Sequence, residues 1–307
     1  MKLKHVISAE QVMDRGFLRE LFRRADGLAS ADVKGGAFAS LKGKVLACLF
    51  YEPSTRTRFS FQAAMYKLGG NVVSLENLEK SSSVAKGESF KDTIKIVSGY
   101  TDCIVLRHPK EGAAQEAASV SSVPVINAGD GGNEHPTQAL LDLYTILKEK
   151  GRLENLKVAF GFDPLHSRTI RSLALALSDY PGSRFTFISP QSLRAPSELT
   201  DKLNERHVPY KETEDLDEGL DVDVLYVNRL QQERFQESQE FEKNRKLLVV
   251  TPDKVQGKDI LILDPLPRID EIDSAVDALP NAAYFRQARN GLYVRMALLE
   301  MLLHGDF

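Results

Sequence analysis

The sequence predicts an α/β fold made of two doubly wound parallel-sheet domains joined by a long helix. Short, nearly continuous apolar runs alternate with helical stretches along the chain, which is typical of parallel strands covered by helices on both faces. A helical pattern over residues 136–150 separates two series of such runs, and Gly151 ends it. A chain of 307 residues is long enough for two domains that each bury a core.

The expected elements follow from this pattern. The first series of strands covers residues 45–50, 72–75, 103–107 and 123–127, and the second covers 157–162, 184–189, 222–227 and 260–264. The main helices are expected at 54–68, 136–150 and 292–303, and the acidic run 212–223 is interpreted as a solvated loop and helix edge. The predicted domains are residues 1–135, completed by a C-terminal helix at about 290–307, and residues 150–285.

Composition and charge exclude several classes of protein. The net charge of −3 gives no reason to expect nucleic acid or an anionic membrane as a partner, so any anion site must be local. No apolar run is long enough to span a membrane, and the first residues lack the apolar core of a signal peptide. Cys48 and Cys103 fall in expected strands and are interpreted as reduced core residues. We therefore expect a cytoplasmic protein.

The segment after the first strand carries the clearest chemistry. Pro53 breaks the apolar run, and Ser54 is a suitable N-cap for a helix that ends at Gly69. The N–H groups of the first helical turn, the helix dipole, and the hydroxyl and guanidinium groups of residues 54–58 would then converge on one anion. The alternative is a capped surface helix that carries two solvated arginines. We predict a phosphate site here.

Further polar clusters follow the other expected strands, where open α/β sheets bind their ligands. These clusters are residues 81–89, 107–109, 129–138, 163–169, 229–234 and 264–268. Most have a simpler interpretation as a flexible loop, a helix cap at His135, or solvated arginines, but the doubled proline at 265–267 is difficult to explain as a plain loop. Leu266-Pro267 is a candidate for a cis peptide bond. The sequence has no G-x-G-x-x-G motif after these strands, no Cys/His set with zinc spacing and no G-x-S-x-G motif.

Three of these segments together resemble the aspartate/ornithine carbamoyltransferase family. They are Ser54-Thr55-Arg56-Thr57-Arg58, His135-Pro136-Thr137-Gln138 and Pro265-Leu266-Pro267-Arg268, and the resemblance extends over about residues 41–303. It implies transfer of a carbamoyl group from carbamoyl phosphate to the amine of L-aspartate, an early step of pyrimidine (UMP) biosynthesis. It also implies a homotrimer that shares its sites between subunits and needs neither a metal nor a cofactor, and it leaves room for regulatory chains.

The resemblance also implies roles for individual residues. Arg56, Thr57 and His135 would polarise the carbamoyl oxygen. Carbamoyl phosphate would be bound by Ser54, Thr55, Arg56, Thr57, Arg107, His135 and Gln138, with Ser82 and Lys86 from a neighbouring subunit. Aspartate would be bound by Lys86, Arg168, Arg229, Gln231 and the carbonyl groups of Pro265 and Leu266. Glu52 would join Arg168 and Arg234 when the two domains close.

The chain departs from the family pattern at three positions. Asp264 replaces the usual His before Pro-Leu-Pro, and Phe162 and Pro164 flank Asp163, where the family commonly has Gly before the Asp. A carboxylate about 4 Å from an anionic ligand would cost about 4 kcal/mol at an effective dielectric constant near 20. We therefore expect Asp264 to point away from the ligand, paired with Arg268 or His166, unless the site is altered.

Other functions stay open alongside aspartate transfer. An ornithine carbamoyltransferase is disfavoured because the chain lacks that branch's Cys in the Pro-Leu-Pro loop and its acidic Ser-Met-Gly segment. A carbamoyltransferase for another amine acceptor and a catalytically weak homologue that acts as a binding or regulatory module are the remaining alternatives.

Overall fold

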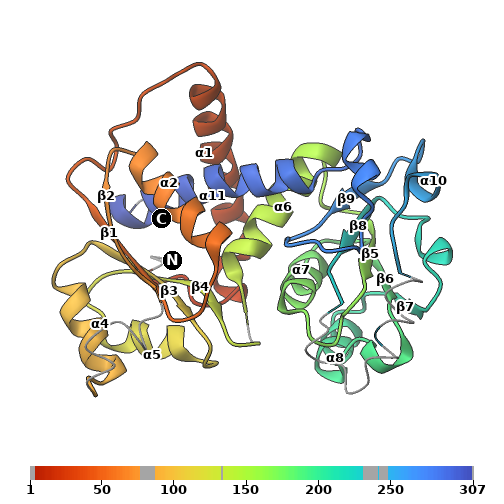
Figure 1. Ribbon diagram of the computed structural model, residues 1–307, viewed down its shortest axis with the longest axis horizontal. Coiled ribbons are helices and arrows are strands. Elements are labelled where there is room, and N and C mark those ends of the chain that lie inside the picture. The colour runs from red at the N-terminus through yellow and green to blue at the C-terminus, as the bar shows by residue number, and fades with distance from the viewer. Residues whose placement is uncertain (1–3, 77–86, 133, 231–240, 242–247, 306–307) are drawn as a thin grey trace. The chain divides into compact units, whose positions relative to one another are not determined.

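The computed structural model of the chain describes residues 4–76, 87–132, 134–230, 241 and 248–305 (Figure 1). The chain divides into two compact units. Unit 1 comprises Met1–Leu141 and Arg289–Phe307, and unit 2 comprises Asp142–Ala288. Each unit contains one parallel sheet with helices, so the predicted fold class is confirmed.

Unit 1 is built on a parallel sheet with the strand order β2-β1-β3-β4. The strands are β1 (Val45–Phe50), β2 (Asn71–Glu76), β3 (Cys103–His108) and β4 (Val125–Asp130). β1 and β3 are neighbours in register, with Phe50 opposite Arg107. Because the chain winds outward in both directions from this pair, the topological switch point, where doubly wound folds bind ligands, lies between the carboxyl ends of β1 and β3.

Helices cover the sheet of unit 1 on both faces, as Figure 1 shows for α4 and α5 on one side and for α2 and α11 on the other. One core cluster joins Ala47, Leu49 and Ile104 of the sheet to Ile94 and Ala117 of the helices. The elements are η1 (Glu10–Val12), α1 (Arg15–Val33), α2 (Thr55–Lys67), α4 (Phe90–Ser98), α5 (Ala113–Val120), α6 (Pro136–Lys150) and α11 (Tyr284–His304). The boundary between the units falls within α6 and within α11.

Unit 2 is built on a parallel sheet with the strand order β7-β6-β5-β8-β9. The strands are β5 (Lys157–Gly161), β6 (Arg184–Ile188), β7 (Tyr210–Thr213), β8 (Val224–Val227) and β9 (Leu261–Leu263). The other elements are α7 (Arg168–Ser178), η3 (Gln191–Leu193), α8 (Ser197–Glu205), η4 (Asp217–Gly219), α10 (Pro252–Val255) and η6 (Ser274–Ala278). The switch point of this sheet lies between β5 and β8.

All eight expected strands are present, with ends within a few residues of the predictions. The short strand β7 was missed because its sequence was assigned in part to the acidic run 212–223. Lys211 and Glu212 lie in this strand, which pairs only with β6 at the edge of the sheet. Edge strands tolerate charged side chains because one of their sides has no strand partner, so the charges did not exclude a strand.

The C-terminal helix begins at Tyr284, eight positions before the expected start at Leu292. Gly291, directly before the expected start, lies inside the helix. A Cβ atom at this position would lie 2.7 Å from Arg295 Nη1 and 2.9 Å from Leu141 Cδ2. The glycine therefore permits close packing against α6 and does not end the helix.

The two cysteines are buried and free, as expected for core residues. Burial raises the pKa of the Cys48 thiol to about 12 and also raises the pKa of Cys103. Both thiols therefore stay protonated and unreactive at neutral pH.

Candidate active site

The predicted phosphate-binding segment opens α2 at the switch point of the unit 1 sheet. Ser54 is the N-cap residue of this helix, and its side chain makes no capping hydrogen bond. Thr57 is buried, whereas Thr55 and Arg56 are exposed. Because the first N–H groups of a helix have no partner within the helix, they and the helix dipole attract an anion at this position.

Arg107 is the last residue but one of the neighbouring strand β3 and is buried. Its guanidinium donates to the Ala128 carbonyl at 3.0 Å and forms an ion pair with Glu52. Burial lowers the pKa of Arg107, and the Glu52 carboxylate opposes that shift. A buried cation at a switch point is suited to bind an anion. In this structure the anion bound to Arg107 is the carboxylate of Glu52.

Gly129 makes room for Arg107, a role that the sequence did not identify. Its backbone φ is +114°, and a Cβ atom at this position would lie 2.2 Å from Arg107 Nη1. Only glycine satisfies both requirements. Gly129 lies two residues after the expected strand 123–127 and inside β4 in the structure, and a glycine in a strand often marks a close approach to the backbone.

His135 and Gln138 lie at the start of α6, and both are buried. The His135 carbonyl accepts from Gln138 N at 2.9 Å, which places His135 at the entrance of the helix as predicted. Thr137 accepts from Arg295 Nη2 of α11 at 3.5 Å, and Arg295 Nη1 donates to Ser60 of α2 at 2.9 Å. Arg295 therefore connects the helix of His135 to the helix of the phosphate-binding segment.

The predicted carboxylate-binding arginines lie at the switch point of the unit 2 sheet. Arg168 is the first residue of α7, which follows β5, and Arg229 follows β8. Asn228 joins the two segments, because its Nδ2 donates to Ser167 Oγ at 2.6 Å and to Thr169 Oγ1 at 3.1 Å. Asn228 was not predicted as a site residue, although a polar residue directly after an apolar strand was the available indication.

The predicted partners of Asp264 are wrong. Arg268 forms an ion pair with Asp277, and His166 Nδ1 lies 3.0 Å from Asp163 Oδ1. The carboxylate of Asp264 instead accepts from the N–H of Leu266 at 2.5 Å. The sequence could not favour this local bond, because it depends on the backbone conformation of the loop.

Two other expectations for this loop region have clear outcomes. The Leu266–Pro267 peptide bond is cis, as predicted. Phe162 is fully buried in the core of unit 2, where its N–H donates to the Asn228 carbonyl at 3.0 Å. The departure from the family pattern at Phe162 therefore places a core side chain at the end of β5.

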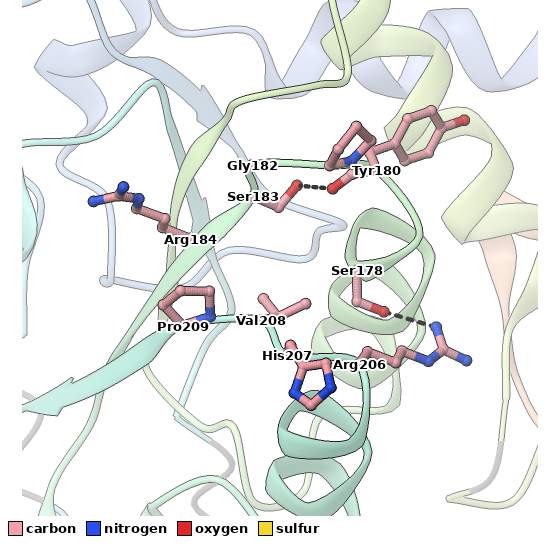
Figure 2. A pocket seen from close by; sticks show the side chains of 10 residues that line it. Ser178, Tyr180, Gly182, Ser183, Arg184, Arg206, His207, Val208 and Pro209 are labelled. Carbon is pink, nitrogen blue, oxygen red and sulfur yellow. Dashed lines mark hydrogen bonds between the residues drawn. The ribbon is translucent and has the colours of Figure 1, made fainter.

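A cavity of about 300 Å³ lies at the opposite, amino edge of the unit 2 sheet, near the starts of β6 and β7 (Figure 2). Arg206 at this cavity donates to Ser178 Oγ at 2.7 Å. None of the predicted site residues lines it. The cavity therefore supports no part of the candidate site.

Several predicted residues lie outside the described part of the chain, namely Ser82, Lys86, Gln231 and Arg234. Their roles stay predictions. Within the residues that the structure describes, no group of three or more His, Cys, Asp and Glu side chains could hold a metal ion. In the same residues, no helix is long and apolar enough to cross a membrane.

Comparison with protein-family models gives two matches that together extend over nearly the whole chain. Residues 4–149 match the carbamoyl-P binding domain of aspartate/ornithine carbamoyltransferase, and residues 154–302 match its Asp/Orn binding domain. The chain belongs to the aspartate/ornithine carbamoyltransferase family. The resemblance inferred from the three sequence motifs is thereby confirmed.

Members of this family with high similarity include proteins from archaea and plants. The aspartate carbamoyltransferase catalytic subunit of Methanocaldococcus jannaschii is 48% identical over 305 residues, which is 99% of each chain. Aspartate carbamoyltransferase 3, chloroplastic, of Pisum sativum is 46% identical over 99% of this chain and 78% of its own length.

Solved structures of the family share the fold. The catalytic subunit of M. jannaschii aspartate transcarbamoylase matches with a TM-score of 0.94 at 48% identity, over 98% of both chains. Aspartate transcarbamoylase of Trypanosoma cruzi in complex with N-(phosphonacetyl)-L-aspartic acid matches with a TM-score of 0.91 at 36% identity, over 97% of this chain and 95% of that chain.

Proposed function

We propose that the chain transfers the carbamoyl group of carbamoyl phosphate to the amine of L-aspartate, which gives N-carbamoyl-L-aspartate and phosphate. The observation that carries this proposal is the position of residues 54–57 at the start of α2, at the switch point where Arg107 lies near the carboxyl end of the adjacent strand. Relatives named aspartate carbamoyltransferase that match nearly the whole chain support the same activity. The reaction then belongs to an early stage of pyrimidine (UMP) biosynthesis.

On the donor side, Ser54, Thr55, Arg56 and Thr57 bind the phosphate and Arg107 adds a second cation. When phosphate binds, Arg107 exchanges its Glu52 partner for the ligand, because both anions compete for the same guanidinium. Gln138 binds the carbamoyl nitrogen. Arg56, Thr57 and His135 donate to the carbamoyl oxygen, on which negative charge grows when the amine attacks.

The chemistry needs no covalent enzyme intermediate. An uncharged amine attacks the carbamoyl carbon, phosphate departs with the electrons of the broken C–O bond, and the proton lost by the amine passes to this phosphate. Donors that are already in place for the developing oxyanion are each worth about 2.7–4 kcal/mol in comparable enzymes. Holding the two substrates in a reactive orientation contributes about 7–11 kcal/mol in well-oriented systems.

On the acceptor side, Arg168, Arg229 and Gln231 bind the carboxylates of aspartate, with Lys86 and the carbonyl groups of Pro265 and Leu266. Two separate arginines favour a dicarboxylate over a cationic acceptor such as ornithine. The link from Asn228 to the start of α7 supports this part of the proposal, because it holds the segments of both arginines. Glu52, once released from Arg107, joins Arg168 and Arg234 when the substrates are bound.

We also propose a homotrimer in which Ser82 and Lys86 reach the site of a neighbouring subunit. Phe59 and Tyr66 of α2 and Val73 and Leu75 of the edge strand β2 are between 44% and 58% exposed. Exposed large apolar side chains favour association with another chain. The family resemblance leaves room for regulatory chains on this trimer, and the expected location is the cytoplasm.

The test offers labelled carbamoyl phosphate together with aspartate, ornithine or another amine and identifies the product. We expect label in N-carbamoyl-L-aspartate, and competitive inhibition against aspartate by succinate, which has both carboxylates but no amine. Label found only in the product of a cationic amine would contradict the acceptor assignment. Binding of carbamoyl phosphate without any product would identify the chain as a catalytically weak homologue.

A further inference from the structure

The loop after β9 contains a residue in an unusual backbone conformation. Leu266 has a φ of +61°, which lies in the left-handed region that residues other than glycine rarely adopt. Such a conformation persists only where the surrounding structure fixes it. The N–H of Leu266 donates to Asp264 Oδ1 at 2.5 Å, and a bond to a carboxylate is among the stronger hydrogen bonds in proteins. Asp264 is therefore a group that holds Leu266 in place.

Asp264 is itself held by a buried network. Its side chain and main chain are only 2% exposed, and its N–H donates to Gln287 Oε1 at 2.9 Å. Gln287 is 1% exposed, and its Nε2 donates to Asp142 Oδ1 at 2.6 Å. Buried polar groups that bond to one another in this way make a segment rigid.

The network continues into the sheet of unit 2. Tyr226 of β8 is fully buried, and its hydroxyl donates to Asp142 Oδ2 at 2.9 Å. Burial raises the pKa of Tyr226 well above its ordinary value, so the hydroxyl keeps the proton that it donates. Tyr226 also lies opposite Leu263, the residue before Asp264, in the pairing of β8 with β9. The loop of Leu266 is thus connected to α6, β8 and α11.

We propose that Asp264 is a positioning residue, whose carboxylate fixes the backbone of Leu266 so that the carbonyl groups of residues 265 and 266 are presented to the amine acceptor. This inference rests on the proposed function, which assigns those carbonyl groups to the acceptor. It also explains how a carboxylate is compatible with an anionic substrate at this place, because the charge of Asp264 is directed into its own loop.

The proposal predicts a selective defect. The members of the network, Asp142, Tyr226, Asp264 and Gln287, all belong to unit 2, whereas the residues proposed to bind phosphate belong to unit 1. Loss of the Asp264 carboxylate should therefore weaken the use of the acceptor and leave the binding of carbamoyl phosphate unchanged.

Asp273 provides a matched control. Its carboxylate also accepts from the N–H two residues further along, at Ala275, at 2.8 Å, but the side chain is exposed and outside the network. The experiment compares D264A with D273A and D264N with D273N. Two readouts are measured: hydrogen exchange of the Leu266 amide, by NMR on protein labelled at leucine, and steady-state kinetics with carbamoyl phosphate and aspartate.

In D264A we expect exchange of the Leu266 amide to rise about tenfold and kcat/KM for aspartate to fall about tenfold, as for loss of one hydrogen bond to a charged group. The KM for carbamoyl phosphate should change less than about twofold, and D273A should resemble wild type in both readouts. D264N keeps an oxygen acceptor, so both of its defects should be about threefold. This variant tests the proposal if D264A does not fold.

For an enzyme that carbamoylates aspartate, both readouts must change in the Asp264 variants relative to the Asp273 variants. A change in neither, or in only one, overturns the proposal. If the wild-type protein forms no product with aspartate, the proposed function fails. The exchange ratio between the Asp264 and Asp273 variants then decides alone whether Asp264 fixes Leu266.

Discussion

Arg107 depends on three neighbours from two other parts of the chain. Glu52 balances its charge, the Ala128 carbonyl accepts from its guanidinium, and Gly129 leaves the space in which that guanidinium lies. Arg56 differs, because it is exposed at the start of α2. The two arginines that are expected to bind the same phosphate are therefore positioned in different ways. Arg107 is fixed by its buried contacts, and Arg56 is placed by the first turn of α2.

Replacement of Arg56 by alanine should separate activity from stability. We expect kcat/KM to fall about 100- to 1,000-fold or more, because a donor to the developing oxyanion is lost. The free energy of unfolding should change by less than about 0.5 kcal/mol, because the side chain is exposed. Steady-state kinetics and urea unfolding measure the two effects.

The control is Arg19→Ala, which removes an exposed arginine from α1 of the same unit. This variant should keep both activity and stability. Near-normal turnover in Arg56→Ala would exclude the proposed role of the phosphate-binding segment.

Single residues were predictable from the sequence where the role depends on local structure. Ser54 as the N-cap of α2 and the cis bond at Leu266–Pro267 follow from a few neighbouring residues, and both are confirmed. The partners of Asp264 could not be predicted. Gln287 lies 23 positions away in the sequence, and its contact depends on how α11 packs against the end of β9.

At the level of elements, the predicted site for carbamoyl phosphate lies at the starts of α2 and α6, and the C-terminal helix α11 contacts both of these helices. Arg295 of α11 donates to Ser60 of α2 and to Thr137 of α6, and its guanidinium lies 5.2 Å from the centre of the Phe61 ring. The sequence predicted α2 from its N-cap at Ser54 and its end at Gly69, and α6 from its helical pattern and Gly151. It could not predict the connection between them, because Arg295 and Ser60 are 235 positions apart.

Replacement of Arg295 by methionine should loosen both helix starts. The hydroxyl groups of Ser60 and Thr137 would lose a charged donor, and bonds of this kind contribute about 1.5–3 kcal/mol to stability. We expect a decrease of this size in the free energy of unfolding, together with weaker binding of carbamoyl phosphate in calorimetry. The matched control is Arg289→Met, because Arg289 lies on the same helix but is exposed. Unchanged affinity in Arg295→Met would show that the contact does not position the site.

At the level of the whole molecule, the sequence predicted two parallel sheets but not their strand orders. The orders decide which loops meet, and in each unit the predicted ligand arginines flank the switch point: Arg56 and Arg107 in unit 1, Arg168 and Arg229 in unit 2. The motifs located these residues in the chain, whereas only the structure identifies β1 and β3, and β5 and β8, as neighbouring strands.

The proposed trimer leads to a prediction that is tested with mixtures of two variant chains. If Lys86 acts in the site of a neighbouring subunit, a trimer that mixes Lys86→Ala and Arg56→Ala chains contains some sites with both residues intact. With random mixing of equal amounts, about one quarter of all sites receive Arg56 from one chain and Lys86 from the next. We therefore expect about one quarter of wild-type activity after two nearly inactive parents exchange subunits. Native mass spectrometry verifies the exchange. If exchange is complete and activity stays at the level of the parents, each site is formed within a single chain, because every chain in the mixture carries one of the two defects.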